Sequence, residues 1–454
     1  MIFLLAFCFI FITFSIGLLW CNMNQTFPAT VTKPAGSRYV CGNYNSTHYY
    51  AQNGITGNCE LISSDAVQVI TYALDNLTSG RTSQETILLD GVFSINRTIP
   101  LSVENVLLNC SLAQLNLIAN TTLLDVHPES KVKLNDTIVG GHWIGRAAEI
   151  GNALQFMYAS NCTFRDANIE GFSAPWGAVS LGWESGNITV QNCWIHDNEA
   201  GVPCINIANS GYNNIVDCRL GNSGTGVMIN SPTSNNQILG CEFYNWATGN
   251  TYQQHGIYLD GAGQCRGGNN VVSGCSFHDP HEGAGILIKS QNNIVSNNTF
   301  YNFFTSAAVG LSIYSQYNPC TANDNDIFDN TFTNMYYGLW LGQDASFCLS
   351  PTLRNKIHNN VFTNTAKCIT FLANGEACWV NDTAVCYNSF SYCTDALGCA
   401  ASTPYVANAV IAYNDFDGAS VSSSIETQCL NTMVYGNTGL ADFNVPAVKP
   451  IPPP

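Results

Sequence analysis

The phrase NNIVDCRL, which begins at Asn213, returns as NNQILGCEF from Asn235, NNVVSGCSF from Asn269 and NNIVSNNTF from Asn292. Apolar residues alternate within each copy, which is typical of a short strand with one buried face. The repeats recur roughly every 23 to 34 residues, a period that indicates a solenoid or another repeat array. Further copies begin at Asn325, Asn355, Thr383 and Asn408.

One position of the phrase is always cysteine or asparagine when the copies are aligned. Parallel strands stacked about 4.8 Å apart would bring these side chains into contact from one repeat to the next. Asparagine amides at this spacing bond to one another along the stack. The sequence therefore predicts a side-chain ladder. Its members are Cys162, Cys193, Cys218, Cys241, Cys275, Asn298, Asn330, Asn360, Asn388, Asn414 and Asn437.

A second short apolar strand follows many of the phrases. Two strands and a third short one in each repeat are typical of one coil of a parallel β-helix. A β-propeller is disfavoured because its four-stranded blades need longer repeats, and the same shortness argues against a β-sandwich. The second strands are GVMIN from Gly226, GIYLD from Gly256, GILIK from Gly285, GLSIY from Gly310 and GLWLG from Gly338.

These repeats resemble the right-handed parallel β-helix proteins of the pectin-lyase-like superfamily, over roughly residues 60 to 440. We therefore predict an all-β, right-handed parallel β-helix solenoid of roughly 11–12 coils. The stretch SSDAVQVITYALDNLTSG precedes it, with Ser63 or Ser64 as the expected N-cap and Gly80 as the end. Its apolar stripe predicts a helix that caps the open end of the stack, which the resemblance also implies.

The chain divides into four predicted segments. Residues 1–21 are apolar and uncharged from residue 2 to residue 20, which predicts a signal peptide or a signal anchor that contacts a membrane. Residues 22–60 form an entry segment that a Cys41–Cys59 disulfide is expected to close. Residues 61–440 form the β-helix, and residues 441–454 are a proline-rich, extended tail.

Composition narrows the classes of partner. The chain has 454 residues and a net charge of −16, which argues against nucleic acid and permits Ca²⁺, although no cofactor is demanded. Its 20 cysteines and several Asn-x-Ser/Thr sequons favour a secreted or cell-surface, disulfide-containing glycoprotein. The expected partner is a polysaccharide or a cell-surface glycan.

The strands that follow the repeated phrase place a candidate glycan site. Their outward positions hold Tyr258, Tyr314 and Trp340, with Asp260 and Lys289 as neighbours on adjacent coils. Aromatic rings beside a few polar groups suit the flat faces and hydroxyls of sugars. The alternative is that these residues lie beneath an inserted loop.

The tetrapeptide Asp279-Pro280-His281-Glu282 resembles the corresponding motif of β-helix mannuronan epimerases. The resemblance implies that His281 transfers a proton, with Asp279 and Glu282 beside it. The tyrosine that this family carries just upstream is Ser276 here, and its downstream arginine has no clear counterpart. Lys289 or Arg266 is the expected substitute for that arginine, and His255 is a further candidate for the same site.

The chemistry leaves three hypotheses. A histidine base and a cation that stabilises the carboxylate would serve a lyase or an epimerase acting on uronate polymers. A glycoside hydrolase would instead need two carboxylates about 5 to 9.5 Å apart, for which Asp260 with Asp279 or Glu282 is the candidate pair. The third is a non-catalytic adhesin or envelope protein. An enzyme would need a base, a cation and aromatic groups together in one groove, whereas such a non-catalytic protein would not.

Overall fold

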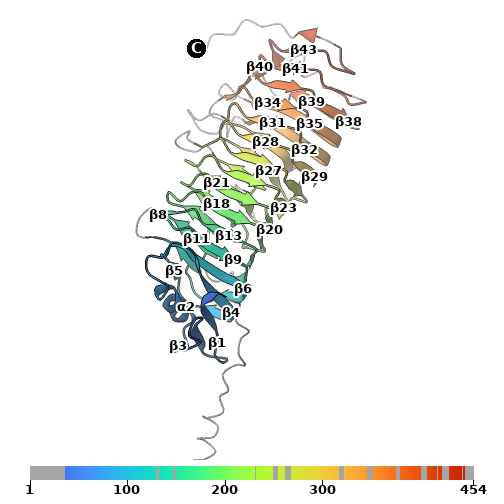
Figure 1. Cartoon of the computed structure of the whole chain (residues 1–454). Helices are drawn as coiled ribbons and strands as arrows, with labels where there is room; N and C mark the ends of the chain where they lie inside the picture. The colour runs from blue at the N-terminus through green and yellow to red at the C-terminus, as the bar shows by residue number, and fades with distance from the viewer. Residues whose placement is uncertain are drawn as a thin grey trace, which may run out of the picture.

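The computed structural model is an elongated stack of coils with the first strands at one end and the last at the other (Figure 1). Arg266, the cysteines Cys320, Cys348 and Cys378, and segment 1–21 lie outside the described residues. The structure describes residues 36–444 except 129–131, 147–149, 231, 249–253, 261–266, 316–321, 345–350, 375–378, 400–405, 417, 422–428 and 442.

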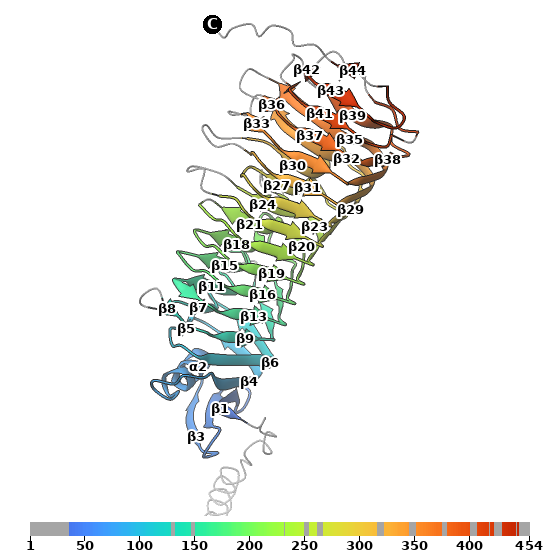
Figure 2. The ribbon, with the colours of Figure 1, turned by 45° about the horizontal axis from the view of Figure 1, so that its top comes forward.

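The coils build three walls of parallel strands, which we call walls A, B and C. Each repeated phrase supplies one strand to wall A, and the turn after it leads into wall B (Figure 2). Wall A contains β9 (Thr137–Val139), β13 (Thr163–Arg165), β16 (Thr189–Gln191), β19 (Asn214–Val216), β22 (Gln237–Leu239), β25 (Val271–Ser273), β28 (Ile294–Ser296), β31 (Asp326–Phe328), β34 (Lys356–His358), β37 (Ala384–Cys386), β41 (Val410–Ala412) and β43 (Met433–Tyr435).

Walls B and C complete each coil. Wall B contains β10 (His142–Ile144), β14 (Asn168–Glu170), β17 (Trp194–His196), β20 (Arg219–Ser223), β23 (Glu242–Trp246), β26 (Ser276–His278), β29 (Thr299–Phe303) and β38 (Ser389–Ser391). Wall C contains β5 (Ile99–Leu101), β7 (Leu124–Val126), β11 (Leu154–Met157), β15 (Val179–Gly182), β18 (Pro203–Ala208), β21 (Thr225–Asn230), β24 (Ile257–Leu259), β27 (Gly283–Ile288), β30 (Ala308–Ile313) and β39 (Asp395–Cys399).

Some strands run through two walls or outside them. The long strands β32 (Thr331–Asp344) and β35 (Val361–Asn374) pass from wall B into wall C without a break. The long strands β4 (Glu85–Ile95) and β6 (Val106–Leu117) open the stack. Short pairings at the turns are β8 (Val132–Lys133) with β12 (Ala159–Ser160), and the series β33 (Thr352–Leu353), β36 (Val380–Asn381), β40 (Val406–Ala407) and β42 (Cys429–Leu430). The prediction of a parallel β-helix is confirmed, with about 11 turns.

The predicted side-chain ladder is present inside the stack. The Nδ2 of Asn298 donates to Asn330 Oδ1 at 3.0 Å, and Asn330 donates in turn to Asn360 at 3.0 Å. The series continues to Asn437. Each amide nitrogen also donates to main-chain carbonyls, which keeps these buried polar groups paired. Cys193, Cys218, Cys241 and Cys275 lie buried at the same position with free thiols, as small apolar residues do. Cys162 precedes β13 of wall A and is in register with Asn213, so its assignment to this ladder is wrong.

The structure contains two further ladders that we did not predict. The second asparagine of the phrase forms its own series, in which Asn236 Nδ2 donates to Asn270 Oδ1 at 3.0 Å. It extends from Asn213 to Asn355. The phenylalanine that ends the phrase stacks on its copy in the next coil, with ring centroids 4.7 Å apart for Phe243 and Phe277. Because the buried rings and the hydrogen-bonded amides recur at the same positions, the core of each coil has the same packing as the core of the coil before it.

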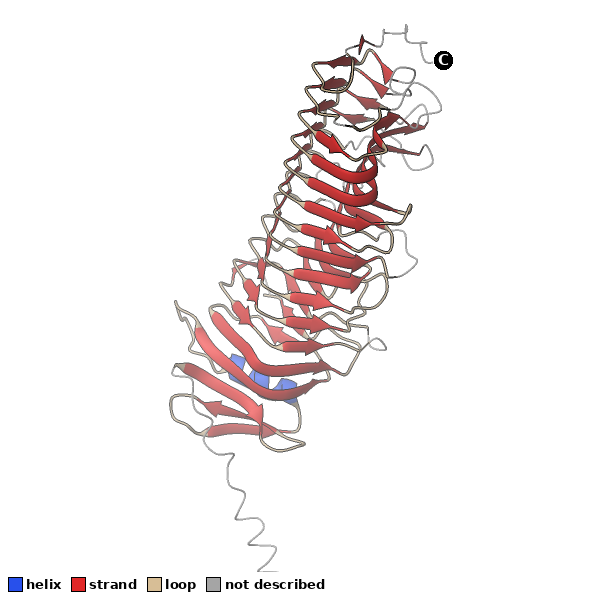
Figure 3. Cartoon of the chain, turned by 90° about the vertical axis from the view of Figure 1, so that its right-hand side faces the viewer, coloured by secondary structure: helices blue, strands red, loops and turns tan. Residues whose placement is uncertain are grey.

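The N-terminal end differs from our prediction in its details. The only helix among the described residues is α2 (Ala66–Asp75), which packs on the first strands and buries Val67, Ile70 and Leu74 (Figure 3). Its N-cap is Asp65, which accepts from the amides of Val67 and Gln68, so the assignment of the cap to Ser63 or Ser64 is wrong. The carboxylate accepts two amide bonds that begin the helix. The helix ends before Asn76, short of the predicted Gly80.

The entry segment is a small antiparallel sheet, without the predicted disulfide. Strands β1 (Ser37–Asn43), β2 (Tyr49–Asn53) and β3 (Cys59–Ser63) pair with one another, and β1 continues into the parallel stack through β4. Cys41 is buried against the helix and Cys59 lies at the start of β3, and both carry free thiols. The prediction of a Cys41–Cys59 bond is therefore wrong. The described part of the segment is held together by the pairing of β1, β2 and β3. At the other end, β44 (Phe443–Asn444) pairs antiparallel with β43.

Candidate functional site

The predicted aromatic stripe exists on the outside of wall C, but most of it is buried. Tyr258, Leu287 and Tyr314 form a small cluster separate from the core, with Met228, Tyr337 and Trp340 packed against it. Tyr258 is only 2% exposed and Tyr314 only 8%. The outward direction of these side chains is as predicted. Their burial agrees with the alternative hypothesis, in which they are covered, and it removes them as a platform for an open glycan chain.

Lys289 is the charged centre of this cluster. Its Nζ donates to the hydroxyl of Tyr258 at 2.9 Å and lies 5.0 Å from the ring centre of Tyr314. Burial lowers the pKa of Lys289 to about 8, and the nearby Asp260 carboxylate opposes that shift. His255 stacks on Tyr258 with its Nδ1 accepting from the amide of Ala284, and burial lowers the pKa of His255 to about 3. His255 is thus a neutral packing group.

The Asp279-Pro280-His281-Glu282 motif does not join this cluster. Asp279 directly follows β26 of wall B, and its carboxylate accepts hydrogen bonds from His278 and Asn302. His281 is exposed and precedes β27, whereas Lys289 follows the end of that strand. Six strand residues span about 20 Å. The structure therefore does not bring His281, Glu282 and Lys289 into one site, nor does it place Glu282 opposite Asp260 as a hydrolase pair.

The outside of wall B carries an exposed row of aromatic and charged groups that we did not predict. We call it the wall-B stripe: Trp194, Arg219, Glu242, Tyr244, His278 and Tyr301. Trp194 is 40% exposed, and its Nε1 donates to the hydroxyl of Tyr244 at 2.9 Å. The guanidinium of Arg219 lies over both rings, 4.6 Å from the centre of Tyr244. These contacts hold two flat faces in fixed positions on the surface.

A histidine and two carboxylates occupy the other half of the stripe. Glu242 binds Arg219 Nε at 2.9 Å and His278 Nε2 at 3.1 Å. Asp279 accepts from His278 Nδ1 at 2.7 Å, so the ring of His278 is fixed from both sides. The ring also lies 4.8 Å from that of Tyr301, in stacked orientation. The arrangement offers an oriented imidazole beside a carboxylate and a cation, the groups that proton transfer next to a sugar carboxylate requires.

A signal for this stripe was present in the sequence. The ladder position is followed by an outward residue, then by the buried Leu or Phe, then by another outward residue, as in Cys241-Glu242-Phe243-Tyr244. The outward residues of the wall-B strands, aligned in this way, place Arg219 beside Glu242 and Tyr244 beside His278.

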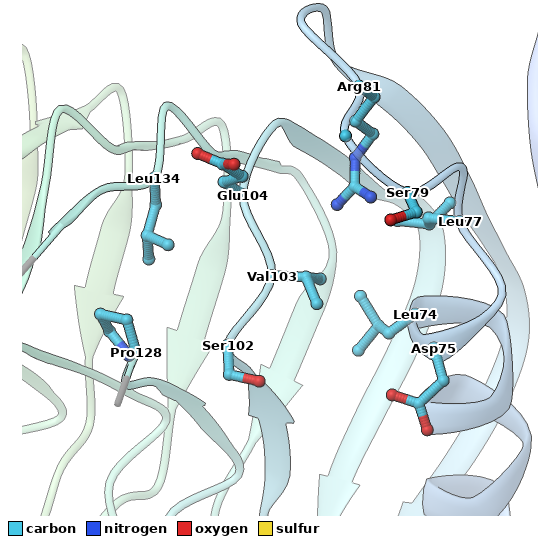
Figure 4. Close-up of a pocket in the computed structure, with 11 residues that line it drawn as sticks. Leu74, Asp75, Leu77, Ser79, Arg81, Ser102, Val103, Glu104, Pro128 and Leu134 are labelled. Carbon is cyan, nitrogen blue, oxygen red and sulfur yellow. The ribbon is translucent and has the colours of Figure 1, made fainter. Parts of the chain in front are cut away.

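A separate cavity of about 550 Å³ lies between the capping helix and the first coils (Figure 4). Its wall combines apolar side chains such as Leu74 and Leu134 with Asp75, Glu104 and Arg81. Arg81 donates to the carbonyls of Asn105 and Thr78, which ties it to the surrounding chain. The cavity lies at the N-terminal end of the stack.

Comparison with known proteins agrees with the fold. The family model described as the right handed beta helix region matches residues 142–273 and 203–385. A 3-dehydroshikimate dehydratase of Acinetobacter baylyi is 33% identical over 115 residues, which cover 24% of this chain and only 22% of that protein.

Two solved structures share the solenoid. The A-module of a mannuronan C-5 epimerase from Azotobacter vinelandii aligns with a TM-score of 0.57 and 14% identity, over 77% of this chain and 94% of that one. The catalytic domain of a GH87 α-1,3-glucanase, in complex with nigerose, aligns with a TM-score of 0.57 and 15% identity, over 82% and 67%. At these identities the likeness is one of fold.

Proposed function

Because the chain belongs to the family of right-handed β-helix regions, we propose that it binds glycans along the wall-B stripe. The observation that carries this proposal is the pair formed by the exposed Trp194 and the half-buried Tyr244, which a hydrogen bond and the Arg219 guanidinium hold in place. Rings that are already ordered stack on sugar faces at little entropic cost. The structural neighbours named above, an epimerase acting on mannuronan and a glucanase, support a glycan ligand.

The charge of the stripe restricts the class of glycan. Its cation, Arg219, is paired with Glu242, and Asp197 and Asp279 lie at the same edge of the wall. A chain with a net charge of −16 repels a polyanion in the absence of a bridging cation. We therefore favour a neutral glycan, with a uronate polymer bound only where Ca²⁺ bridges the carboxylates.

The location is part of the proposal. The apolar residues 2–20 and the sequons support an exported protein, secreted or held at the cell surface, where extracellular glycans are available. A non-catalytic adhesin or envelope component would use the same stripe. Glycan binding is therefore common to both the catalytic and the non-catalytic hypotheses.

Affinity electrophoresis and calorimetry with neutral and uronate polysaccharides test the proposal. We expect Trp194→Ala and Tyr244→Ala each to weaken binding about tenfold or more, since aromatic side chains that become covered on binding dominate such contacts. The matched control is Trp183→Ala, an exposed tryptophan in the turn after β15 of wall C. Equal losses in all three variants, or no glycan retained by the wild type, would refute the proposal.

The oriented imidazole of His278 favours a second candidate, lyase or epimerase chemistry on a uronate polymer. In this candidate the substrate displaces Glu242 from His278 Nε2, that nitrogen takes the proton from carbon 5, and Arg219 stabilises the carboxylate. Elimination at carbon 4 then gives an unsaturated product, or return of the proton to the other face gives the epimer. Unsaturated-product absorbance and carbon-5 proton exchange should disappear in His278→Gln and persist in His281→Ala. Loss in His281→Ala alone would restore the motif-based assignment, and inactivity of the wild type would leave binding only.

A further inference from the structure

One turn position between walls A and B, directly before the ladder residue, has a left-handed backbone in successive coils. Its φ angle lies between 51° and 68°. Glycine, asparagine and aspartate adopt this conformation most readily, whereas a bulky side chain in it is an outlier. Tyrosine nevertheless occupies the position in two adjacent coils. Its members are Asn192, Asp217, Gly240, Gly274, Asn297, Asp329, Asn359, Tyr387, Tyr413 and Gly436.

Packing does not account for either tyrosine. Tyr387 is 59% exposed and Tyr413 is 50% exposed, so burial of their rings offsets little of the cost of the backbone conformation. The corresponding residue of the preceding coil, Asn359, shows that the turn needs no aromatic ring. A residue that departs from the local preference without a structural gain is expected at a functional position.

The two tyrosine rings stack on one another across the coils. Their centroids lie 5.2 Å apart and their planes differ by 12°. The amide of Tyr387 donates to the carbonyl of Ala412 at 3.2 Å, which holds the two turns together. The next coil presents Gly436 to the Tyr413 ring, and a Cβ at that glycine would come within 2.7 Å of the ring. The glycine therefore leaves the space that the second ring occupies.

This stacked arrangement argues against a further glycan platform. Sugars stack on an open ring face, and the Tyr413 ring already contacts Tyr387 and Tyr435, the latter with centroids 5.4 Å apart. Two exposed phenols held in contact suit a different chemistry, oxidative coupling. One-electron oxidation of each phenol gives a phenoxyl radical, whose unpaired electron is shared with the ring carbons ortho to the oxygen. Radicals fixed next to each other combine in an effectively unimolecular step.

We propose that Tyr387 and Tyr413 form a cross-linking site, at which a haem peroxidase using hydrogen peroxide joins the two rings as dityrosine. An ortho carbon of one ring bonds to an ortho carbon of the other, and each ring loses the hydrogen at that carbon. Hydrogen peroxide accepts the two electrons and two protons and leaves as two molecules of water. The proposal is independent of glycan binding, because neither tyrosine belongs to the wall-B stripe.

The cross-link would connect two adjacent coils near the C-terminal end of the stack. The strands there are short, since β40 and β42 have two residues each and β41 and β43 have three each. A covalent bond between the two tyrosines closes a loop in the unfolded chain, and so reduces its conformational entropy as a disulfide does. Oxidation should therefore protect the last coils from local unfolding.

Peroxidase treatment of the full chain tests this site. With hydrogen peroxide present, the monomer isolated by size exclusion should acquire dityrosine fluorescence and lose the mass of two hydrogen atoms. Peptide mapping should join the segment of Tyr387 to that of Tyr413. We expect Tyr387→Phe and Tyr413→Phe each to lower the yield of monomer fluorescence about tenfold or more, since phenylalanine keeps the ring but forms no phenoxyl radical. Native-state hydrogen exchange should show slower opening of β41 and β43 after oxidation.

Two further variants serve as controls. Tyr392 is 84% exposed and is thus more accessible to an oxidant than either member of the pair. Tyr336 meets Tyr337 edge to face, with ring planes 77° apart. Tyr392→Phe and Tyr336→Phe should both retain the monomer fluorescence.

Three results would overturn the proposal. The first is a loss of yield in either control as large as that in Tyr387→Phe. The second is a wild type that gives only cross-linked oligomers or no dityrosine. The third is a full yield of monomer fluorescence in both Tyr387→Phe and Tyr413→Phe.

Discussion

The predicted ladder has a cysteine half and an asparagine half, and the two halves make different side-chain contacts. From Asn298 onwards each ladder amide makes hydrogen bonds of about 3.0 Å to the next side chain and to the main chain. In the preceding coils Cys218 and Cys241 make only thiol contacts of 3.3 to 3.6 Å. The backbone pairing is nevertheless continuous across both halves. The strands therefore define the coil, and the ladder residue adjusts how much each coil contributes to stability.

The outside of wall B changes at the same place. Three ladder cysteines are followed directly by Trp194, Arg219 and Glu242. The ladder asparagines are followed by one charged residue, Asp415, and otherwise by uncharged residues such as Thr299 and Thr331. The charged and aromatic outer groups thus lie over the cysteine half. Outward residues of a strand are not constrained by the core, so they are free to carry a binding surface. The asparagine half serves mainly as a stable stack.

The largest expected loss of stability comes from a substitution that breaks the asparagine ladder. Asn330→Ala removes the acceptor of the Asn298 main-chain and side-chain amides and the side-chain donor to Asn360 Oδ1. The buried main-chain amide of Asn298 is then left unpaired. We expect the free energy of unfolding to fall by about 3–5 kcal/mol. Cys218→Ala should cost only about 1–2 kcal/mol, since it removes a small apolar group. Urea unfolding with hydrogen exchange would measure both, and equal losses would contradict the comparison.

The second-largest effect concerns a buried carboxyl group near the N-terminal end of the stack. Asp136 is buried beside the first coils, and burial raises the pKa of its carboxyl to about 8. Because its pKa in the folded state exceeds that in the unfolded state, stability should fall as pH rises from about 4 to about 8. Asp136→Asn should remove this slope and raise the free energy of unfolding by about 2–4 kcal/mol at the upper end.

Unfolding measured across that pH range checks this prediction. The control is Asp217→Asn, which alters an exposed carboxylate in the turn after β19. An unchanged slope in Asp136→Asn would show that another group causes the pH dependence.

A smaller effect concerns the buried cation of wall C. Burial lowers the pKa of Lys289 to about 8, below its unfolded value, so stability should rise as pH increases from about 8 to about 10.5. Lys289→Met keeps most of the apolar contact, and it should stabilise the protein by about 1–2 kcal/mol at neutral pH and remove that rise. Thermal melts along the pH series measure it. Lys367→Met, over the ring of Tyr337, is the control that should keep the rise.

The smallest effect on stability belongs to the wall-B stripe. Arg219→Ala removes a surface ion pair with Glu242 and its contacts with two rings. We expect a change of about 0.5–1 kcal/mol in the free energy of unfolding, together with a clear loss of glycan affinity. A loss of stability as large as that of Asn330→Ala would mean that the stripe is structural. Calorimetric binding and urea unfolding on the same sample separate the two outcomes.

Much of the fold could be predicted because it depends on a local pattern that recurs. Alternation within the phrase identifies the strands, and the repeat identifies the stacking partner, as Asn330 and Asn360 demonstrate. The cap at Asp65 could not be assigned in this way, because three adjacent residues, Ser63 to Asp65, are all suitable caps. The Cys41–Cys59 pairing failed because proximity in sequence does not determine which thiols meet in space.

Less of the candidate site could be predicted from the sequence. That sequence by itself determined the coil, the ladder and the outward direction of Tyr258 and Tyr314, since all three depend on periodicity. Only the tertiary structure decided that those rings are buried, and that His278 meets Glu242 from the preceding coil. The physical reason is that exposure and side-chain contact depend on the coils above and below, whose separation along the chain varies with each inserted loop.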